Sequence, residues 1–283
     1  MRPTIHWPDG KKICVMFSIA YEAFESAGKF KKNRDLKVNL TALSHSQYGG
    51  RVGIWRLMEI FNKNGVHASI AANGLAAKTW PESFRALHEG GHELFGHGYS
   101  NERNNNDLTA EQQREDVRKT TQAIEEASGY RPVGWGSPGS VFTEFTLPIL
   151  AEEGYMWCGD PIDDDNPYVV TVNGKRMAIV PKVNYANDFR AWGDGLMSGE
   201  DYFLGYKTTF DYIREDALRG KPGTIMAILH SELGGRPHMA YAVNKMIRYA
   251  KKHSDLVWFA TRRECAEHCL ATVKEAEEFN PWS

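Results

Sequence analysis

Three ionisable side chains of this sequence stand at the ends of short apolar runs. Glu22 follows the run 13–19, His97 ends the run 92–97, and His230 follows the run 224–229. If these runs are parallel strands, their carboxyl ends meet at one edge of the sheet, where α/β enzymes carry their chemistry. A carboxylate can take a proton from water, and a histidine can give one to a leaving group near neutral pH. The sequence therefore predicts one site for acid–base chemistry.

Other polar and aromatic residues lie at the ends of the remaining runs. Asn73, Trp135 and Asp160 take these positions. We expect Asp160 to bind substrate N–H groups. Trp135, like Tyr48, can cover a flat ring, but an aromatic residue in this position can equally belong to the core, so both interpretations of Trp135 stay open.

Apolar runs of strand length alternate with amphipathic helical patterns along the chain. Such alternation is typical of parallel βαβ units and favours an α/β fold with a barrel or an open sheet. Asn173-Gly174 is the turn signature of a β-hairpin over 169–180. The expected strands are 13–19, 66–72, 92–97, 132–136, 155–159, 224–229 and 256–260; the expected helices are 51–64, one opening at a capping box of Thr79 and Glu82, 109–128 with a capping box of Thr109 and Gln112, 143–153, 237–252 and one after 260.

Length and composition fit a single domain spanning residues 1–283. The formal net charge of −2 argues against nucleic acid or an anionic membrane as the main partner, because either needs a basic face. The few cysteines show no spacing typical of a disulfide framework. The sequence has no apolar leader and no run of about 18 apolar residues, so we expect a cytoplasmic location.

Several motifs together resemble the polysaccharide deacetylase (NodB-like) superfamily, also called carbohydrate esterase family four. Within it the chain is most similar to the metal-independent allantoinases and cyclic imidases. The resemblance implies a distorted (β/α) barrel of about seven parallel strands and hydrolysis of a carbon–nitrogen bond other than a peptide bond. The motifs are Ala20-Tyr21-Glu22, the string YGGRVGIWR at 48–56, His97-Gly98-Tyr99, Arg131-Pro132, Asp163 to Tyr168 (DDDNPY), and His230 through Arg236-Pro237.

The metal motif of that superfamily is incomplete in this sequence. Its usual site has an Asp pair after the first strand, one Asp acting as the base and the other binding a divalent metal with two histidines after the third strand. Here Glu22 is the carboxylate after the first strand, and Asn101 replaces the second histidine. An amide is a poor zinc ligand. The expected cofactor is therefore none, or one weakly held divalent metal such as zinc on Glu22 and His97.

The resemblance also suggests roles for the residues. Glu22 would activate water for attack on an amide, imide or ureide carbonyl, His97 would hold the carbonyl oxygen, and His230 would protonate the leaving nitrogen. A loop between Glu25 and Ser46 would shape or close the pocket. The expected substrate is a small molecule and the expected assembly a homotetramer. The residues expected to bind the substrate are Tyr48, Arg51, Trp135, Asp160 and Arg236.

Two other functions stay open from the sequence. One is a metal-dependent de-N-acetylase of an amino sugar or acylated amine. The other is a non-catalytic ligand-binding protein with a degraded deacetylase site. The incomplete metal motif supports the second alternative, whereas the presence of Glu22, His97 and His230 opposes it.

Overall fold

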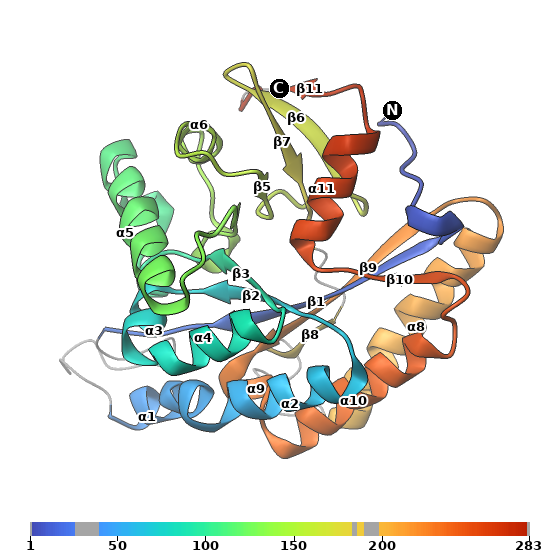
Figure 1. Ribbon diagram of the computed structural model, residues 1–283, viewed down its shortest axis with the longest axis horizontal. Coiled ribbons are helices and arrows are strands. Elements are labelled where there is room, and N and C mark those ends of the chain that lie inside the picture. Colours follow the sequence, from blue (N-terminus) through green and yellow to red (C-terminus); the bar gives the residue numbers. More distant parts are fainter. Residues whose placement is uncertain (1, 26–39, 183–185, 190–197, 282–283) are drawn as a thin grey trace.

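The fold is built on one continuous and mostly parallel β-sheet (Figure 1). The computed structural model describes residues 2–25, 40–182, 186–189 and 198–281. Among these the strand order is β11-β6-β7-β5-β4-β3-β2-β1-β9-β8, and β10 also pairs with β1. The strands are β1 (Ile13–Tyr21), β2 (Ser69–Ala72), β3 (Glu93–Gly96), β4 (Gly134–Trp135), β5 (Trp157–Cys158), β6 (Tyr168–Val172), β7 (Lys175–Ile179), β8 (Ala186–Asn187), β9 (Gly223–His230), β10 (Val257–Phe259) and β11 (Glu277–Glu278).

Strand β1 pairs with β2, β9 and β10 and is buried along its whole length. A strand covered on both faces needs apolar residues on both, which explains its unbroken apolar run in the sequence. Its odd-numbered residues from Ile13 to Tyr21 pack into the core beneath the outer helices, whereas Cys14, Met16 and Ala20 join the core on the inner face. Because side chains alternate along a strand, this inner row leads directly to Glu22.

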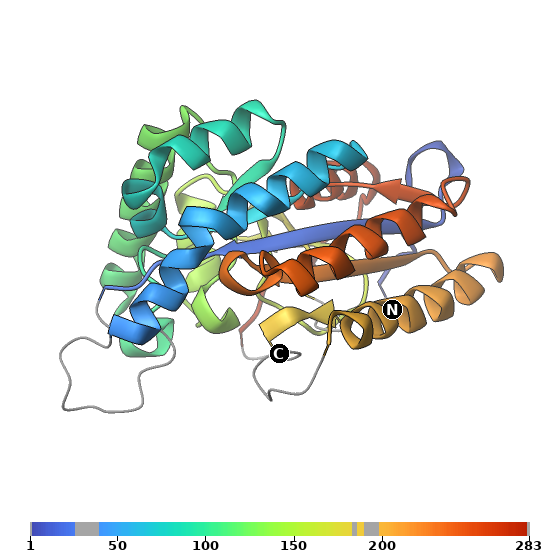
Figure 2. The same ribbon diagram turned by 90° about the horizontal axis from the view of Figure 1, so that it is seen from below.

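Helices cover the outer face of the sheet (Figures 1 and 2). Helices α2 and α8 both pack against α10, and α8 also contacts β9. The helices are α1 (Leu40–Tyr48), the π-helix η2 (Gly49–Gly53), α2 (Ile54–Asn64), α3 (Gly74–Thr79), α4 (Pro81–Glu89), α5 (Ala110–Ser128), α6 (Thr146–Glu152), α8 (Gly199–Leu218), α9 (Ser231–Gly234), α10 (Pro237–Lys251) and α11 (Arg262–Thr272), with short 3-10 turns η1 (Pro8–Gly10), η3 (Asn105–Asp107) and η4 (Pro138–Ser140).

The sheet curves until its two ends approach each other. Strand β7 ends at Ile179 and β8 begins at Ala186, although the two strands lie near opposite ends of the strand order. So short a stretch of chain spans at most about 25 Å. Since the described strands show no pairing between the two ends, the barrel is incomplete. The predicted α/β fold, a distorted barrel with a mostly parallel sheet, is confirmed.

Local sequence signals predict an element correctly where residues close together in the chain form it. The capping box of Thr109 and Gln112 opens α5, and the hairpin turns at Asn173-Gly174, both with positive φ. The capping box predicted at Thr79 is wrong. Thr79 ends α3 and donates its hydroxyl to the Leu75 carbonyl, and α4 begins after Trp80 without a side-chain cap.

Some elements of the fold were not predicted from the sequence. Helix α8 begins at a capping box of Ser198 and Asp201 and buries Tyr202, Tyr206 and Phe210 at a spacing of four residues. Charged residues between these aromatics weaken the apolar pattern. Helix α1 lies at the end of the segment expected to be the pocket-closing loop, most of which falls outside the described residues.

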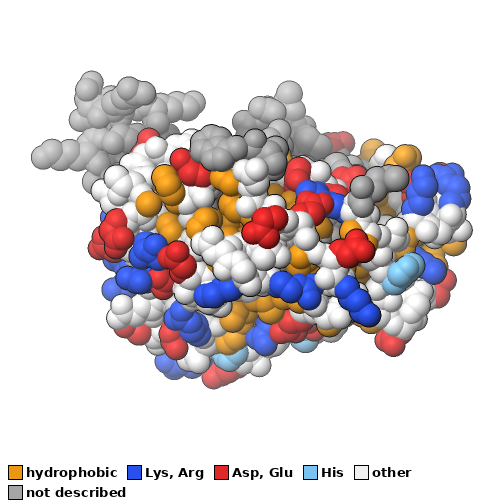
Figure 3. All heavy atoms as spheres, turned by 90° about the horizontal axis from the view of Figure 1, so that it is seen from above, with side chains coloured by type: hydrophobic (Ala, Val, Ile, Leu, Met, Phe, Trp, Pro, Cys, Tyr) orange, Lys and Arg blue, Asp and Glu red, His pale blue; other side chains and the backbone are white. Residues whose placement is uncertain are grey.

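Acidic and basic side chains are mixed over the face shown in Figure 3, without a large basic patch. This distribution agrees with the nearly balanced charge of the sequence. Within the described ranges, every helix is too short or too polar to cross a membrane.

Candidate active site

The register of the sheet places the residues predicted to carry the chemistry at one edge. Tyr21 of β1 lies opposite Ala72 of β2, and Ala72 lies opposite Gly96 of β3. The residues that follow these three positions are Glu22, Asn73 and His97, so they start from the same edge of the sheet. On the other side of β1, Ala20 lies opposite His230, the last residue of β9.

A pocket of about 570 Å³ opens at this edge. Its volume lies in the range of small-molecule sites. Its inner wall includes Ser18, Ala20 and Glu22, the inward row of β1. Other polar residues lining it are His97, Asn101, Ser137, Ser140, Asp160, Lys182, Asn187, His230 and Arg262.

Glu22 lies between the two predicted histidines. Its Oε1 is 3.6 Å from Nε2 of His97 and 3.7 Å from Nε2 of His230. All three side chains are buried. These are ion-pair distances, longer than direct hydrogen bonds. The structure thus brings the three predicted catalytic residues together around one carboxylate oxygen.

The backbone fixes which nitrogen of His97 faces the pocket. Nδ1 of His97 lies 2.5 Å from the Gly136 carbonyl, which can only accept a hydrogen bond, so Nδ1 carries a proton. The neutral ring therefore presents a lone pair on Nε2 toward Glu22. In that form His97 can bind a cation, and it can donate to a carbonyl oxygen only when it is doubly protonated.

His230 has a partner that sequence reasoning missed. Asp188, fully buried, accepts the His230 backbone N–H at 2.7 Å and holds Nδ1 of its ring at 2.6 Å. This arrangement fixes the orientation of the ring and directs Nε2 toward the pocket. Asp188 follows the two-residue strand β8, which pairs with β9. So short a strand leaves no periodic signal in the sequence.

Asn73 ties the loop that carries Glu22 to the loop that carries His97. Its side-chain oxygen accepts the backbone N–H of Ala23 at 2.9 Å, and its amide donates to the carbonyls of His97 and Gly98. Asn73 is fully buried, so these bonds have no competition from water. We infer that Asn73 sets the separation between Glu22 and His97.

Replacing Asn73 with alanine is expected to lower kcat at least tenfold and to destabilise the fold by about 2–4 kcal/mol. The expected destabilisation follows from the buried backbone groups that lose their partner. Steady-state kinetics and thermal unfolding measure the two effects. Asn64→Ala is the control, because Asn64 bonds the Ile60 carbonyl and Asn244 away from the pocket. Equal effects of the two variants on kcat would show that Asn73 has no positioning role.

Asp160 is held at the pocket wall by Ser137. The Ser137 backbone N–H and hydroxyl donate to its two oxygens at 2.7 and 2.6 Å. Burial raises the pKa of Asp160, and the bonds from Ser137 partly offset this rise. Asp160 lines the pocket as expected, but both of its oxygens are already engaged.

Trp135 is a core residue, which decides between its two interpretations. It is 1 % exposed, lies edge-on against Tyr155, and does not line the pocket. Its indole N–H donates to the Ser137 hydroxyl at 3.1 Å. Its ring therefore packs behind the pocket wall, which agrees with the core interpretation of Trp135.

Ser137→Ala is expected to lower the free energy of unfolding by about 2–4 kcal/mol. The Ser137 hydroxyl accepts from Trp135 and Asn105 and donates to Asp160, so its removal leaves three buried groups without this partner. Denaturant unfolding measures the change. Ser254→Ala, an exposed serine, is the control and is expected to change stability by less than about 0.5 kcal/mol. A similarly small change for Ser137→Ala would show that the hydrogen bonds of Ser137 do not stabilise the pocket wall.

Three residues expected to bind the substrate lie outside the pocket. The Arg236 guanidinium lies 3.7 Å over the Tyr48 ring, and the Tyr48 hydroxyl donates to the Gly235 carbonyl at 3.3 Å. Arg51 is exposed on η2. Tyr48 and Arg236 contact one another and the loop after His230, so the structure does not bring Tyr48, Arg51 and Arg236 together with Glu22, His97 and His230.

The glycines of the YGGRVGIWR string have a packing role instead. A side chain at Gly53 would overlap the backbone carbonyl of Ser231, and one at Gly49 would overlap the Ser231 hydroxyl. The close approach of η2 to Ser231 is possible only with glycine at these positions. The string thus supports the segment that follows His230.

The donor set does not fit a tightly held transition metal. Glu22 and His97 offer an oxygen and a nitrogen of the right kind, but the third position holds the amide Asn101, which is a weak ligand. Within the described ranges, no group of three histidine, cysteine or acidic residues is arranged to bind a metal ion. Only Glu22 and His97 are therefore available as strong ligands at this place.

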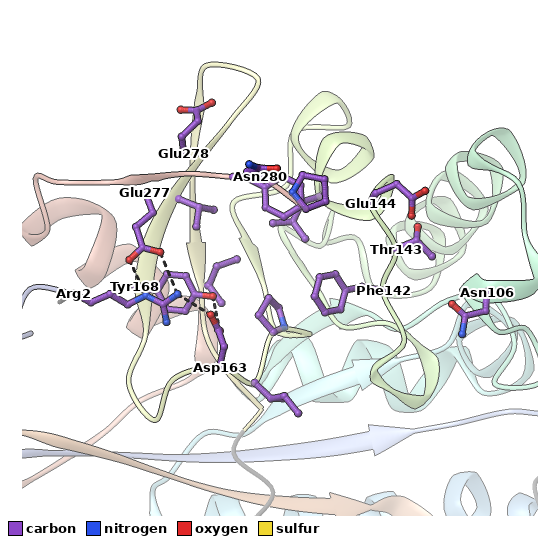
Figure 4. Close-up of a pocket in the computed structure, with 17 residues that line it drawn as sticks. Arg2, Asn106, Phe142, Thr143, Glu144, Asp163, Tyr168, Glu277, Glu278 and Asn280 are labelled. Carbon is purple, nitrogen blue, oxygen red and sulfur yellow. Dashed lines mark hydrogen bonds and ion pairs between the residues drawn. The ribbon is translucent and has the colours of Figure 1, made fainter. Parts of the chain in front are cut away.

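A second cavity of about 630 Å³ lies beside the first and shares Phe142 and Ile162 with it (Figure 4). Arg2 lies at one side of this cavity, paired with Asp163 at 2.7 Å and Glu277 at 2.9 Å. The described residues that line it include no histidine, cysteine or lysine. This cavity holds no acid–base pair like that of Glu22 and His230.

Comparison with known proteins agrees with this geometry. Residues 48–157 match the family model described as polysaccharide deacetylase. The PuuE allantoinase structure has a TM-score of 0.88 at 29% identity, covering 97% of this chain and 95% of the other. The structure of a probable polysaccharide deacetylase from Pseudomonas aeruginosa PAO1 has a TM-score of 0.88 at 29% identity, covering 96% of each chain. A peptidoglycan deacetylase of Helicobacter pylori is 28% identical over 56% of this chain and 52% of its own length.

These comparisons support the polysaccharide deacetylase family for this chain. They confirm the expected enzyme class, a hydrolase of carbon–nitrogen bonds other than peptide bonds.

Proposed function

We propose that residues 1–283 form one catalytic domain that opens a small cyclic imide or ureide by hydrolysis of its C–N bond. The observation that carries the proposal is the position of Glu22 between His97 and His230, with Asn101 at the place of a metal-ligating histidine. This pocket keeps the acid and base of a hydrolase but has a weak donor set for a metal. A cytoplasmic homotetramer stays a prediction from the sequence.

In the proposed reaction Glu22 takes a proton from a water molecule while the water oxygen bonds to the ring carbonyl carbon. The C–N bond then breaks, its electron pair stays on nitrogen, and the imidazolium of His230 gives that nitrogen a proton. Asp188 keeps the ring of His230 oriented and stabilises its charge. Glu22 returns its proton to Nε2 of His230, 3.7 Å away, so that one water is consumed per ring.

His97 contributes in the same step through its charge. When doubly protonated it donates from Nε2 to the carbonyl oxygen, where negative charge develops. Its Nδ1–H stays on the Gly136 carbonyl throughout.

A metal-dependent de-N-acetylase is the second candidate. The family-model match over 48–157 and the peptidoglycan deacetylase relative favour it. Against it, Asn101 leaves the donor set with only Glu22 and His97 as strong ligands.

A substrate panel separates these functions. Purified protein is incubated with allantoin, hydantoin, succinimide and N-acetylglucosamine, and products are followed by mass spectrometry. We expect ring opening of at least one cyclic compound and no acetate release. Acetate release alone would establish the de-N-acetylase. Saturable binding of a ring without turnover would establish the ligand-binding protein.

A further inference from the structure

The second cavity adjoins the active-site pocket at two apolar side chains. Its volume of about 630 Å³ lies in the range of small-molecule sites, and it shares Phe142 and Ile162 with the pocket that holds Glu22. Figure 4 shows Phe142 pointing into this cavity. Phe142 is 37 % exposed and Ile162 is 67 % exposed, although both side chains are large and apolar. Exposed apolar side chains that line a hollow mark a place where an apolar group can bind.

The loops that carry these two side chains are joined at the pocket wall. Phe142 closely follows the turn η4, which begins directly after Ser137, and Ile162 closely follows Asp160. The Ser137 backbone N–H and hydroxyl donate to the two oxygens of Asp160 at 2.7 and 2.6 Å. A boundary that is held in this way is organised before a ligand arrives, which lowers the entropic cost of binding.

Apolar residues of the core form part of the remaining wall of this cavity. Leu147 of α6 and Val170 of β6 line it and belong to the same buried cluster, and the half-buried Phe279 packs against that cluster. An aryl or alkyl group in the cavity would therefore contact apolar atoms of several elements. Such contact is favourable in proportion to the apolar area that leaves water.

The charges around this cavity disfavour an anion. Among the described residues that line it, Arg2 is the only cation, and three carboxylates already balance its charge. The lining also carries the exposed carboxylates of Glu144 and Glu278. An anionic group in the cavity would therefore meet like charges, whereas an uncharged group would not. The carboxylates that bind Arg2 are those of Asp163, Asp164 and Glu277, at 2.7, 3.1 and 2.9 Å.

We propose that the second cavity is a subsite for an uncharged apolar substituent of the substrate ring. The ring lies beside Glu22 in the active-site pocket, and its substituent passes Phe142 and Ile162 into the cavity. The ligand class is a small hydrolysable ring that carries an aryl or branched alkyl group on a ring carbon. This inference rests on the proposed function and goes beyond it, because ring opening itself needs no substituent.

Affinities for a series of ring substituents test the subsite. Hydantoin and its methyl, benzyl and carboxymethyl derivatives, substituted at the ring carbon, are titrated by calorimetry into Glu22→Gln, which is expected to bind the ring but to open it slowly. We expect the benzyl derivative to bind at least about tenfold more tightly than hydantoin, because a phenyl group leaves water. The carboxymethyl derivative is expected to bind no more tightly than the methyl derivative. Equal affinities for hydantoin and the benzyl derivative, or tightest binding of the carboxymethyl derivative, would overturn the subsite.

The variant Phe142→Ala tests whether the substituent crosses the shared boundary. Introduced into Glu22→Gln, it is expected to remove most of the preference for the benzyl derivative over hydantoin. Phe145→Ala is the matched control and is expected to keep the preference, because Phe145 is 42 % exposed and lines neither cavity. Thermal unfolding shows whether each variant is folded, and Ile162→Ala replaces Phe142→Ala if the latter does not fold. An unchanged preference in the folded variant would overturn the proposal.

Ring opening by wild type, measured on the same series, separates this inference from the proposed function. Ring opening without a benzyl preference in binding would leave the function standing and overturn the inference. A benzyl preference that depends on Phe142, without ring opening, would support the inference while the proposed function fails. No binding of any ring of the series would overturn both.

Discussion

Glu22→Gln is expected to lower kcat/KM for ring opening by about 10²–10⁴, the usual contribution of a general base. Glutamine has nearly the same shape but cannot accept a proton from water. It also removes the negative charge that lies between His97 and His230. Substrate affinity is expected to change much less, because the binding groups are elsewhere in the pocket. Steady-state kinetics and calorimetry measure the two quantities.

The matched control for this variant is Glu25→Gln. Glu25 is an exposed carboxylate on the same loop and lies 3.4 Å from Arg103. We expect it to retain wild-type kcat/KM within about threefold, since surface ion pairs contribute little. Equal losses in the two variants would indicate a general effect of charge and would contradict the role of Glu22 as the base.

His230→Gln is expected to lower kcat by about 10²–10⁴ for a substrate with a poor leaving nitrogen, because that nitrogen must take up a proton as the C–N bond breaks. The loss is expected to shrink for a ring whose leaving nitrogen is more acidic. Asp188→Asn is expected to show the same dependence with a smaller loss, since Asp188 acts through His230. Kinetics over a series of ring substituents measure this dependence.

A loss of equal size for every leaving group would contradict the assignment of His230 as the general acid. Asp211→Asn provides a control for Asp188. Asp211 bonds Lys207 and Tyr249 on the outer helices and does not line the pocket. It is expected to leave the substituent dependence of wild type unchanged.

The sequence could predict the catalytic group because parallel strands end together. Glu22, His97 and His230 each follow or end a buried strand, and the register of β1, β2, β3 and β9 brings those ends to one edge. The alternation of side chains along β1 determines which residue faces the pocket. Tyr21 points to the outer helices, where it stacks with Phe84, whereas Glu22 points into the pocket.

The supporting residues were harder to predict because tertiary contacts position them. Asp188 follows β8, a strand of only two residues. Arg262 is the first residue of α11, and an arginine side chain on a helix is usually exposed. Nothing in the local pattern shows that either one reaches the pocket region. Arg236 is among the residues that the resemblance suggests for substrate binding, but its guanidinium packs over Tyr48. Only the packing of α9 against η2 and α1 determines that outcome.

The most direct test of the central claim is ring opening by purified protein whose metal content has been measured, before and after treatment with a chelator. The claim is that Glu22 and His230 hydrolyse the ring C–N bond without a metal. It predicts far less than one bound metal ion per chain and a kcat that the chelator does not change. One metal per chain, with activity lost on chelation and restored by zinc, would contradict it and would make Glu22 and His97 metal ligands.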